Sequence, residues 1–353
     1  MNIQLPTIKC VVWDLDNTLW KGTLLEDSRV VVDDAIRTVI RALDQRGILQ
    51  SVASKNDFEL AWARLEETEL SNYMLIPQIG WNPKSHAIRE IATKLSFSYN
   101  TIAFVDDQAT ERAEVNFHFP DVRCYDASAI SNLLDRQEFN PRRVTVESKH
   151  RRQMYQASLQ RDCEREEFVG PDDEFIRSLQ LELSINNAIA DDLARVEELT
   201  LRTSQMNATG IHYSEDRLHE LLASSDHEVL IGTLTDKFGT YGAIGIALLQ
   251  KLDFHWRIKL LATSCRVITL GIGSVILTWI INRAAEAGVH LIADFRRTER
   301  NRIMEIAYRF AGFNDSNCPC LPGEILDDAV SLLHVVPERR QIPSTMTVSA
   351  PDF

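Results

Sequence analysis

The residues best suited to chemistry in this sequence are two pairs of aspartates, and each pair directly follows an apolar run. Asp14 and Asp16 form the first pair, and Asp106 and Asp107 form the second. If both runs are strands of one parallel sheet, their carboxyl ends meet at the edge where open α/β sheets bind ligands. Crowded carboxylates raise one another's pKa unless a dication lies among them, and oxygen ligands suit magnesium. The pattern predicts a Mg²⁺ site made by all four aspartates, although aspartates that only end strands in turns would share this spacing.

Two further residues extend this set toward phosphate chemistry. Ser54 ends the apolar run 48–53, where its hydroxyl and backbone could hold a phosphate oxygen. Lys84 stands at the expected start of a helix, a suitable place for an ammonium that faces phosphate. An aspartate nucleophile with a second carboxylate, a cation and a hydroxyl nearby is what phosphoryl transfer through an aspartyl-phosphate requires. The alternative for Ser54 is a simple helix cap.

Cys265 is the cysteine whose position best suits a nucleophile. It follows the strand-like run 256–263, adjoins Arg266, and precedes a turn with Gly271 and Gly273 and a long helical pattern. A guanidinium and a helix N-terminus both lower the pKa of a thiol. A buried core thiol is the alternative, because free cysteine often packs as a small apolar residue.

The remaining cysteines carry weaker signals. Cys10 lies within an apolar run and Cys124 in a similar one, so we expect both in the core. Cys318 and Cys320 flank Pro319 and suggest a metal site. No second thiol pair or histidine pair stands at ligand spacing in the sequence, so we interpret them as loop cysteines.

The segments that must position these residues predict two α/β domains. Over the first 135 residues, apolar runs alternate with helical patterns, which predicts a doubly wound parallel sheet. The expected strands there are 8–13, 48–53, 74–79, 101–105 and 122–125, and the expected helices are 33–46, 57–68, 84–95 and 108–116. In the second block the expected strands are 228–235, 243–252, 256–263 and 290–294, and the expected helices are 193–201, 273–287 and 300–310. The predicted organisation is a first domain at 1–137, a helical linker at 138–170, a second domain at 171–335 and a loose tail at 336–353.

Composition bounds the class of protein. A chain of 353 residues with 44% hydrophobic and 25% charged residues is typical of globular proteins with about two domains. The net charge of −13 argues against a nucleic-acid partner. The uncharged stretch 267–282 is shorter than the about 20 residues of a spanning helix, so no membrane is expected. The 6 cysteines in no framework spacing, with no secretory segment before them, favour free thiols and a cytoplasmic location.

The acidic set resembles the four motifs of the haloacid dehalogenase (HAD) superfamily of phosphatases over about residues 8–125. The resemblance rests on Asp14, Asp16 and Thr18 in the order D-x-D-x-T, followed by Ser54, Lys84 and the pair Asp106-Asp107. It implies that Asp14 attacks phosphorus and that Asp16 acts as general acid and base. The short segment between Asp16 and the helix near 33 leaves room for only a minimal cap. Such a site accepts a bulky or protein-borne substrate, unless the second domain or a partner acts as the lid.

The second half resembles the GNAT acyltransferase fold. The resemblance rests on the turn with Gly271 and Gly273 between a strand and a helix, then on Asn301 and on Ala307-Tyr308 before Gly312-Phe313. GNAT proteins usually carry Arg or Gln three residues before the first glycine, where this chain has Ile268. The departure weighs against coenzyme A, while a thioester arm could still occupy the groove. Tyr308 is placed like the general acid of some GNAT enzymes, although a core aromatic is the commoner role.

The two halves together resemble the FkbH-like family over roughly residues 8–313. The matching stretches are 9–20, 54–57, 104–107, 201–207, 238–239, 264–267 and 300–301. Thr240 and the loop 269–271 depart from the family pattern, and these departures affect the expected shape of the acyl pocket and hence the substrate.

The FkbH-like resemblance implies a bifunctional glyceryltransferase and phosphatase of polyketide biosynthesis. Cys265 would take the acyl group of 1,3-bisphosphoglycerate, and the HAD half would remove the remaining phosphate. The phosphopantetheine thiol of an acyl carrier protein would accept the glyceryl unit. The alternative is a Mg²⁺-dependent phosphatase of a small or protein-bound phosphomonoester whose GNAT-like half only binds.

A carrier protein with acidic helices would need a basic face on this acidic chain. The densest basic stretch contains Arg296, Arg297, Arg300 and Arg302. If this stretch is helical, Arg296 and Arg300 share one face. Electrostatic docking there would raise the association rate and weaken with salt.

Overall fold

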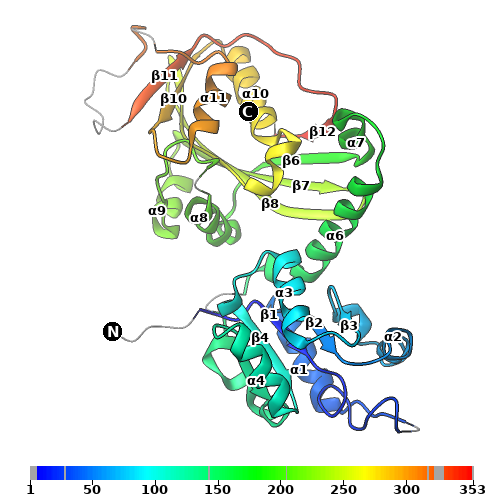
Figure 1. The fold of residues 1–353 in the computed structure, drawn as a ribbon. Helices are drawn as coiled ribbons and strands as arrows, with labels where there is room; N and C mark the ends of the chain where they lie inside the picture. The colour runs from blue at the N-terminus through cyan, green and yellow to red at the C-terminus, as the bar shows by residue number, and fades with distance from the viewer. Residues whose placement is uncertain are drawn as a thin grey trace. The chain divides into compact units, whose positions relative to one another are not determined.

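The computed structural model describes residues 6–27, 29–141, 144–203, 205–315, 318–321 and 330–351, without the side chains of Val146, Arg202 and Cys265. The chain divides into two compact units, Met1–Gln156 and Ala157–Phe353 (Figure 1). The division falls within α6 (Arg151–Glu167), inside the segment predicted as a linker.

Unit 1 is built on a parallel sheet with the strand order β3-β2-β1-β4-β5. Its strands are β1 (Cys10–Trp13), β2 (Leu49–Ser54), β3 (Gln78–Ile79), β4 (Ile102–Asp106) and β5 (Arg123–Asp126). Its main helices are α1 (Asp34–Gln45), α2 (Phe58–Glu67), α3 (Lys84–Leu95) and α4 (Ala109–His118). The strand order reverses between β1 and β4, which is the doubly wound arrangement predicted from the sequence.

The central strands explain why the aspartates meet. Every residue of β1, β2 and β4 is buried because both faces of these parallel strands are covered, and most of these residues are apolar; the exceptions are Gln50, Ser51, Ser54 and Asp106. Trp13 pairs with Val52 of β2 and with Val105 of β4. One residue further along, Asp14, Ala53 and Asp106 therefore stand level at the carboxyl edge of the sheet.

Unit 1 has a short loop after Asp16 in place of a large cap, and only a short strand within the run 74–79. The chain after Asp16 closes into a small loop in which Lys21 and Val31 exchange backbone hydrogen bonds of 2.9 and 3.2 Å, as a minimal cap requires. The run 74–79, predicted as a strand, forms only β3 at its end. Met74 makes an isolated bridge with Gln50 before Pro77, and β3 pairs with β2 after it, because Pro77 lacks the N–H that a continuous ladder needs.

Unit 2 is built on a mixed sheet with the strand order β11-β10-β9-β8-β7-β6-β12. Its strands are β6 (Leu181–Asn187), β7 (His227–Asp236), β8 (Gly239–Lys251), β9 (His255–Thr263), β10 (His290–Phe295), β11 (Ser331–Val335) and β12 (Met346–Ser349). Its helices include α7 (Asp172–Ser178), α8 (Leu193–Arg202), α9 (Glu215–Leu222), α10 (Ile272–Glu286) and α11 (Arg302–Phe310). Strands β6 to β9 are antiparallel neighbours, whereas β9 and β10 are parallel. The mixed α/β class expected for both halves is confirmed.

Helix α10 contains most of the uncharged stretch 267–282, and eight of its residues are buried in the core of unit 2. Among the residues that the structure describes, no helix has the length and apolar character to cross a membrane.

Three expectations for unit 2 need correction. The segment 336–353, predicted as a loose tail, contains β12, which pairs parallel to β6 from Met346 to Ser349. Strands β6 and β12 escaped prediction because half-buried strands alternate polar and apolar residues and lack a continuous apolar run, and the short β11 was also missed. Helix α11 begins only at Arg302, so Arg296 and Arg300 lie in a loop and share no helical face.

Candidate active site

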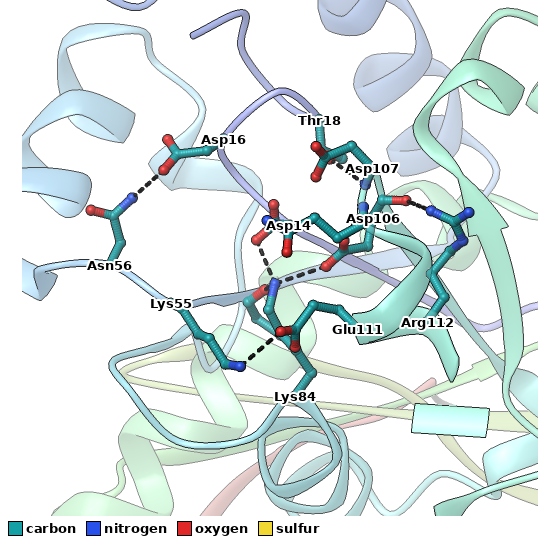
Figure 2. Close-up of polar contacts among 12 residues, drawn as sticks. Asp14, Asp16, Thr18, Lys55, Asn56, Lys84, Asp106, Asp107, Glu111 and Arg112 are labelled. Atoms are coloured by element: carbon teal, nitrogen blue, oxygen red, sulfur yellow. Dashed lines mark hydrogen bonds and ion pairs between the residues drawn. The ribbon is translucent and has the colours of Figure 1, made fainter. Parts of the chain in front are cut away.

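The carboxyl edge of the unit 1 sheet gathers three of the four predicted aspartates (Figure 2). Side-chain oxygens of Asp14, Asp106 and Asp107 all lie within 4.8 Å of one another. Asp14 and Asp106 are buried, with 6% and 1% of their surface exposed, whereas Asp107 is partly open. These three residues, together with Lys84, are called the acidic cluster below.

Lys84 supplies the positive charge of the acidic cluster. It is the first residue of α3, and its Nζ donates to Asp14 Oδ1 at 2.5 Å, to Asp106 Oδ2 at 2.9 Å and to the carbonyl of Ala53 at 2.8 Å (Figure 2). Only 3% of its surface is exposed. A buried ammonium is stable here because two carboxylates and a carbonyl replace its water shell.

The charges of the acidic cluster perturb one another. Burial raises the pKa of Asp14 to about 6, and Asp106 adds to this effect while Lys84 opposes it. Burial, followed by repulsion from Asp106, also raises the pKa of Asp107. For Lys84, burial acts to lower the pKa, but Asp14 and Asp106 together outweigh it and raise the pKa above its ordinary value. One lysine leaves three carboxylates short of positive charge.

Hydrogen bonds from neighbouring residues fix the turn that carries Asp106 and Asp107. The backbone N–H of Asp107 donates to Thr18 Oγ1 at 3.1 Å, and the N–H of Gln108 donates to Asp106 Oδ1 at 2.8 Å. Arg112 donates to the carbonyl of Asp106 at 2.6 Å. Thr18, the last residue of the D-x-D-x-T pattern, thus joins the loop after β1 to the end of β4.

The carboxylate of Asp16 lies outside the acidic cluster, and its role as a metal ligand stays a prediction. Its Oδ1 accepts hydrogen bonds from Trp20 Nε1 at 2.7 Å and from the N–H of Leu24 at 3.0 Å, and its Oδ2 accepts from Asn56 Nδ2 at 3.0 Å. Figure 2 shows its carboxylate turned toward Asn56. The tight loop after β1 supplies these donors, so its folding, and not strand alternation, sets where Asp16 points.

The rim of the site includes Ser54, whose phosphate-binding role stays a prediction, and two residues to which the sequence assigned no role, Lys55 and Asn56. Ser54 ends β2, is buried, and accepts the N–H of Gly80 through its carbonyl at 3.0 Å. Lys55 reaches across to Glu111 on α4 with Nζ and Oε1 2.7 Å apart. Asn56 is buried beside Asp16. It belongs to the stretch 54–57 that matches the FkbH-like family, and this match was the only sequence feature that could have identified it as a site residue.

The acidic cluster fits a divalent cation. Asp107 Oδ1 is buried and has no hydrogen-bond partner among the described residues, so one carboxylate oxygen is already stripped of water. Carboxylate oxygens are the ligands that Mg²⁺ prefers, usually alongside several waters. Asp14, Asp106 and Asp107 would hold the ion through their side-chain oxygens.

The predicted thiol site lies at the end of β9 in unit 2. Cys265 begins a short 3-10 helix (Cys265–Leu270), which separates it from α10, so it does not stand at the N-terminus of the long helix. Its side chain lies outside the described part of the structure, and its predicted role stays a prediction. The other five cysteines are free thiols.

Strands β9 and β10 stop pairing before β9 reaches Cys265. They pair only from His255 to Ile258 of β9. Beyond that point the segment 206–208 bonds to β9, with the N–H of Ala208 donating to the carbonyl of Leu261 at 3.0 Å. Asn301 is buried and donates to the carbonyls of Asn207 and Arg296, which fastens this segment to the end of β10.

Two buried polar groups near the end of β9 have no partner among the described residues. They are Asn207 Nδ2 and Thr263 Oγ1, and both residues are almost fully buried. An unsatisfied buried donor costs roughly 1–3 kcal/mol, which a polar ligand would recover. Tyr308 is also buried, packed against Phe313, as expected for a core aromatic.

Comparison with known proteins yields fold likenesses only. No family model matches the sequence, and no curated protein matches it. The solved structures that match include the N-terminal part of a Bacteroides fragilis protein containing a phosphatase domain complexed with Mg, at 26% identity and a TM-score of 0.34, over 36% of this chain and 39% of that chain. The cobalt-bound deoxy-D-mannose-octulosonate 8-phosphate phosphatase of Haemophilus influenzae matches 33% of this chain and 67% of its own, at 20% identity and a TM-score of 0.28.

A second group of similar structures consists of acetyltransferases. The ribosomal-protein-S18-alanine N-acetyltransferase of Escherichia coli matches 44% of this chain and 93% of its own, at 17% identity and a TM-score of 0.33. Scores of this size are too low to transfer a function from either group.

Proposed function

We propose that the chain is a bifunctional enzyme, a Mg²⁺-dependent phosphatase in unit 1 joined to an acyltransferase in unit 2. The observation that carries the proposal is the acidic cluster, in which Lys84 bridges Asp14 and Asp106 at the switch point of a parallel sheet. That edge is where doubly wound folds bind ligands. The resemblance to FkbH-like proteins refines the proposal to glyceryl transfer from 1,3-bisphosphoglycerate to an acyl carrier protein.

In the phosphatase half, Asp14 is the nucleophile. One carboxylate oxygen of Asp14 forms a bond to phosphorus, and the bond from phosphorus to the alcohol oxygen breaks. Lys84 holds Asp14 in place and offsets the charge of the incoming phosphate. A bound Mg²⁺ supplies the remaining positive charge for the phosphoryl oxygens.

Asp16 is the general acid of this half. It gives its proton to the leaving alcohol and later takes one from the water that cleaves the aspartyl-phosphate. Its carboxyl group must first leave Trp20 and Asn56, because in the described arrangement it bonds to both. The small loop after Asp16 leaves the site accessible to a phosphate carried on a protein.

In the acyltransferase half, the Cys265 thiolate attacks the acyl carbon of the acyl phosphate. The carbon–sulfur bond forms, the bond to the phosphate oxygen breaks, and inorganic phosphate leaves. Asn207 Nδ2 and Thr263 Oγ1, which have no hydrogen-bond partner among the described residues, would bind the hydroxyl groups of the acyl chain. The carrier's phosphopantetheine thiol then displaces Cys265.

Two variants test the two halves separately. Asp14→Asn keeps an acceptor for Lys84, so the fold should persist while a phosphorylated acyl adduct accumulates on the enzyme, measured by intact mass. Cys265→Ala should abolish the adduct and keep hydrolysis of a generic phosphomonoester. Exposed Cys163→Ser serves as the matched thiol control.

The decisive readout is the mass of the carrier protein. A glyceryl adduct that depends on bisphosphoglycerate supports the full proposal. Free phosphate with no adduct on enzyme or carrier would contradict the acyltransferase and would support the alternative, a phosphatase whose second half only binds. A dephosphorylated adduct formed by Asp14→Asn at the wild-type rate would remove Asp14 from the mechanism.

A further inference from the structure

Four metal-ligating side chains converge in unit 2, independently of the acidic cluster. They are His290, Cys318, Cys320 and His334, and one ligand atom of each lies within 4.8 Å of the others. His290 Nδ1 is 3.3 Å from Cys320 Sγ, 3.4 Å from Cys318 Sγ and 3.1 Å from His334 Nε2. The two sulfur atoms are 3.1 Å apart. His334 is buried and the other three side chains are partly buried.

The fold assembles this set from three places in the chain. His290 begins β10, and His334 lies on the antiparallel neighbour β11, where it pairs with Ile292. A residue two positions from a cross-strand partner is a diagonal neighbour on the same face, so both imidazoles point to one side. Cys318 and Cys320 come from the loop after α11. Both cysteines lie outside helices and strands, as predicted, and the sequence spacing did not reveal their histidine neighbours because these stand on separate strands.

We propose that these four residues bind a structural zinc ion. Two thiolates and two imidazoles are a common structural zinc set, with Zn–S near 2.3 Å and Zn–N near 2.0 Å. A regular tetrahedron with those bonds has edges of about 3.3–3.8 Å between ligand atoms. The separations of 3.1–3.4 Å in the structure lie at or just below the lower end of that range, so the four ligand atoms need to move apart only slightly to surround an ion.

The composition of the site selects the ion and its role. Soft thiolates with imidazoles favour zinc, whereas the all-oxygen acidic cluster favours magnesium. Four protein ligands leave no open position for a substrate or water, so the ion fastens structure. It ties the loop after α11 to strands β10 and β11 at the edge of the sheet. The two thiolates balance the charge of the ion, and both thiols release their protons when it binds.

Elemental analysis of the purified full-length chain tests the proposal. We expect about one zinc ion per chain after gel filtration, whereas magnesium exchanges away on dialysis. The double variant Cys318→Ser with Cys320→Ser, and the single variant His334→Ala, should lose the zinc. Matched controls should keep it. They are His255→Asn, whose histidine pairs with His290 from the neighbouring strand, and the exposed Cys163→Ser.

Cobalt substitution of the wild-type chain keeps the test valid if a variant fails to fold. Co²⁺ should give the intense visible bands of a four-coordinate ion together with thiolate charge-transfer absorption, and zinc should abolish both. A wild-type protein that holds no zinc and gives no such bands would overturn the proposal. So would zinc retained by the folded double variant, or a Cys318–Cys320 disulfide found by non-reducing mass spectrometry. Iron or copper in place of zinc would overturn the assignment of the ion.

Discussion

Replacing Lys84 by methionine removes the cation of the acidic cluster with little change in side-chain length. Lys84, Asp14 and Asp106 are all at least 94% buried, so the variant leaves two carboxylates in the core without a counter-charge. Removing one partner of a buried ion pair typically costs about 3–5 kcal/mol of folding free energy. For Lys84→Met we expect a loss of this size at pH 8.

The loss should depend on pH in a defined direction. Folding raises the pKa of Asp14 to about 6, so the stability linked to this group is greatest at low pH and declines as the pH rises through 6. Lys84 acts to lower the pKa of Asp14, and its removal extends that decline to higher pH. The deficit of Lys84→Met should therefore shrink between pH 8 and pH 5, and added Mg²⁺ should restore more stability to the variant than to the wild type.

Native-state hydrogen exchange of the amides of β1 and β4 measures this effect in unit 1 alone. A loss of about 3–5 kcal/mol lowers their protection by roughly two to four orders of magnitude. Lys55→Met is the matched control, because Lys55 is 41% exposed and pairs with Glu111 at the rim, where an ion pair is worth about 0–1 kcal/mol. Equal losses for the two variants, or a Lys84→Met deficit that does not change with pH, would refute this account of the cluster.

Three further predictions follow from the described residues. Mg²⁺ affinity, measured by calorimetry, should fall about tenfold for each pH unit below 6, because a proton on Asp14 competes with the ion. Asp14→Asn should lose this pH dependence. An affinity of the wild type that does not change with pH would contradict the raised pKa of Asp14. Asp107→Asn should weaken Mg²⁺ binding roughly 10–100-fold while raising the stability of the metal-free protein, because it removes a negative charge that Asp106 repels. Unchanged affinity would exclude Asp107 from the site. Of the basic stretch predicted to dock a carrier protein, Arg296 bonds to the carbonyl of Thr209 and Arg297 pairs with Glu305. The exposed Arg300 and Arg302 remain, and Arg302 lies on α11 together with the exposed Ile306 and Phe310. Arg302→Glu should slow transfer to the carrier several-fold at low salt, whereas Arg339→Glu, also highly exposed, should not; indifference to both salt and Arg302→Glu would place the docking face elsewhere.

The sequence was most informative where a single physical cause fixed the outcome. The apolar runs before Asp14 and Asp106 could be interpreted as buried parallel strands because only apolar residues fit between two covered faces. An aspartate that ends such a run must lie at the carboxyl edge of the sheet. Lys84 was placed correctly for a similar reason, since the first residue of α3 follows directly from the helical pattern and Pro83.

Features set by long-range register could not be predicted in this way. The direction of the Asp16 carboxylate depends on donors from Trp20 and Asn56 that only the folded loop brings near. His290 and His334 meet only because β10 and β11 are neighbours, and no local pattern records that pairing. Strand β12 was missed because its side chains are only half buried, so no apolar run marks it.

Trapping the phosphorylated enzyme tests the central claim most directly. The wild-type chain, incubated with Mg²⁺ and a phosphomonoester and quenched in acid, would be treated with borohydride, which reduces an aspartyl-phosphate to homoserine, and then mapped by mass spectrometry. The account predicts homoserine at position 14 that requires Mg²⁺ and is absent from Asp14→Asn. Turnover without modification at position 14, or modification at Asp107 instead, would contradict it.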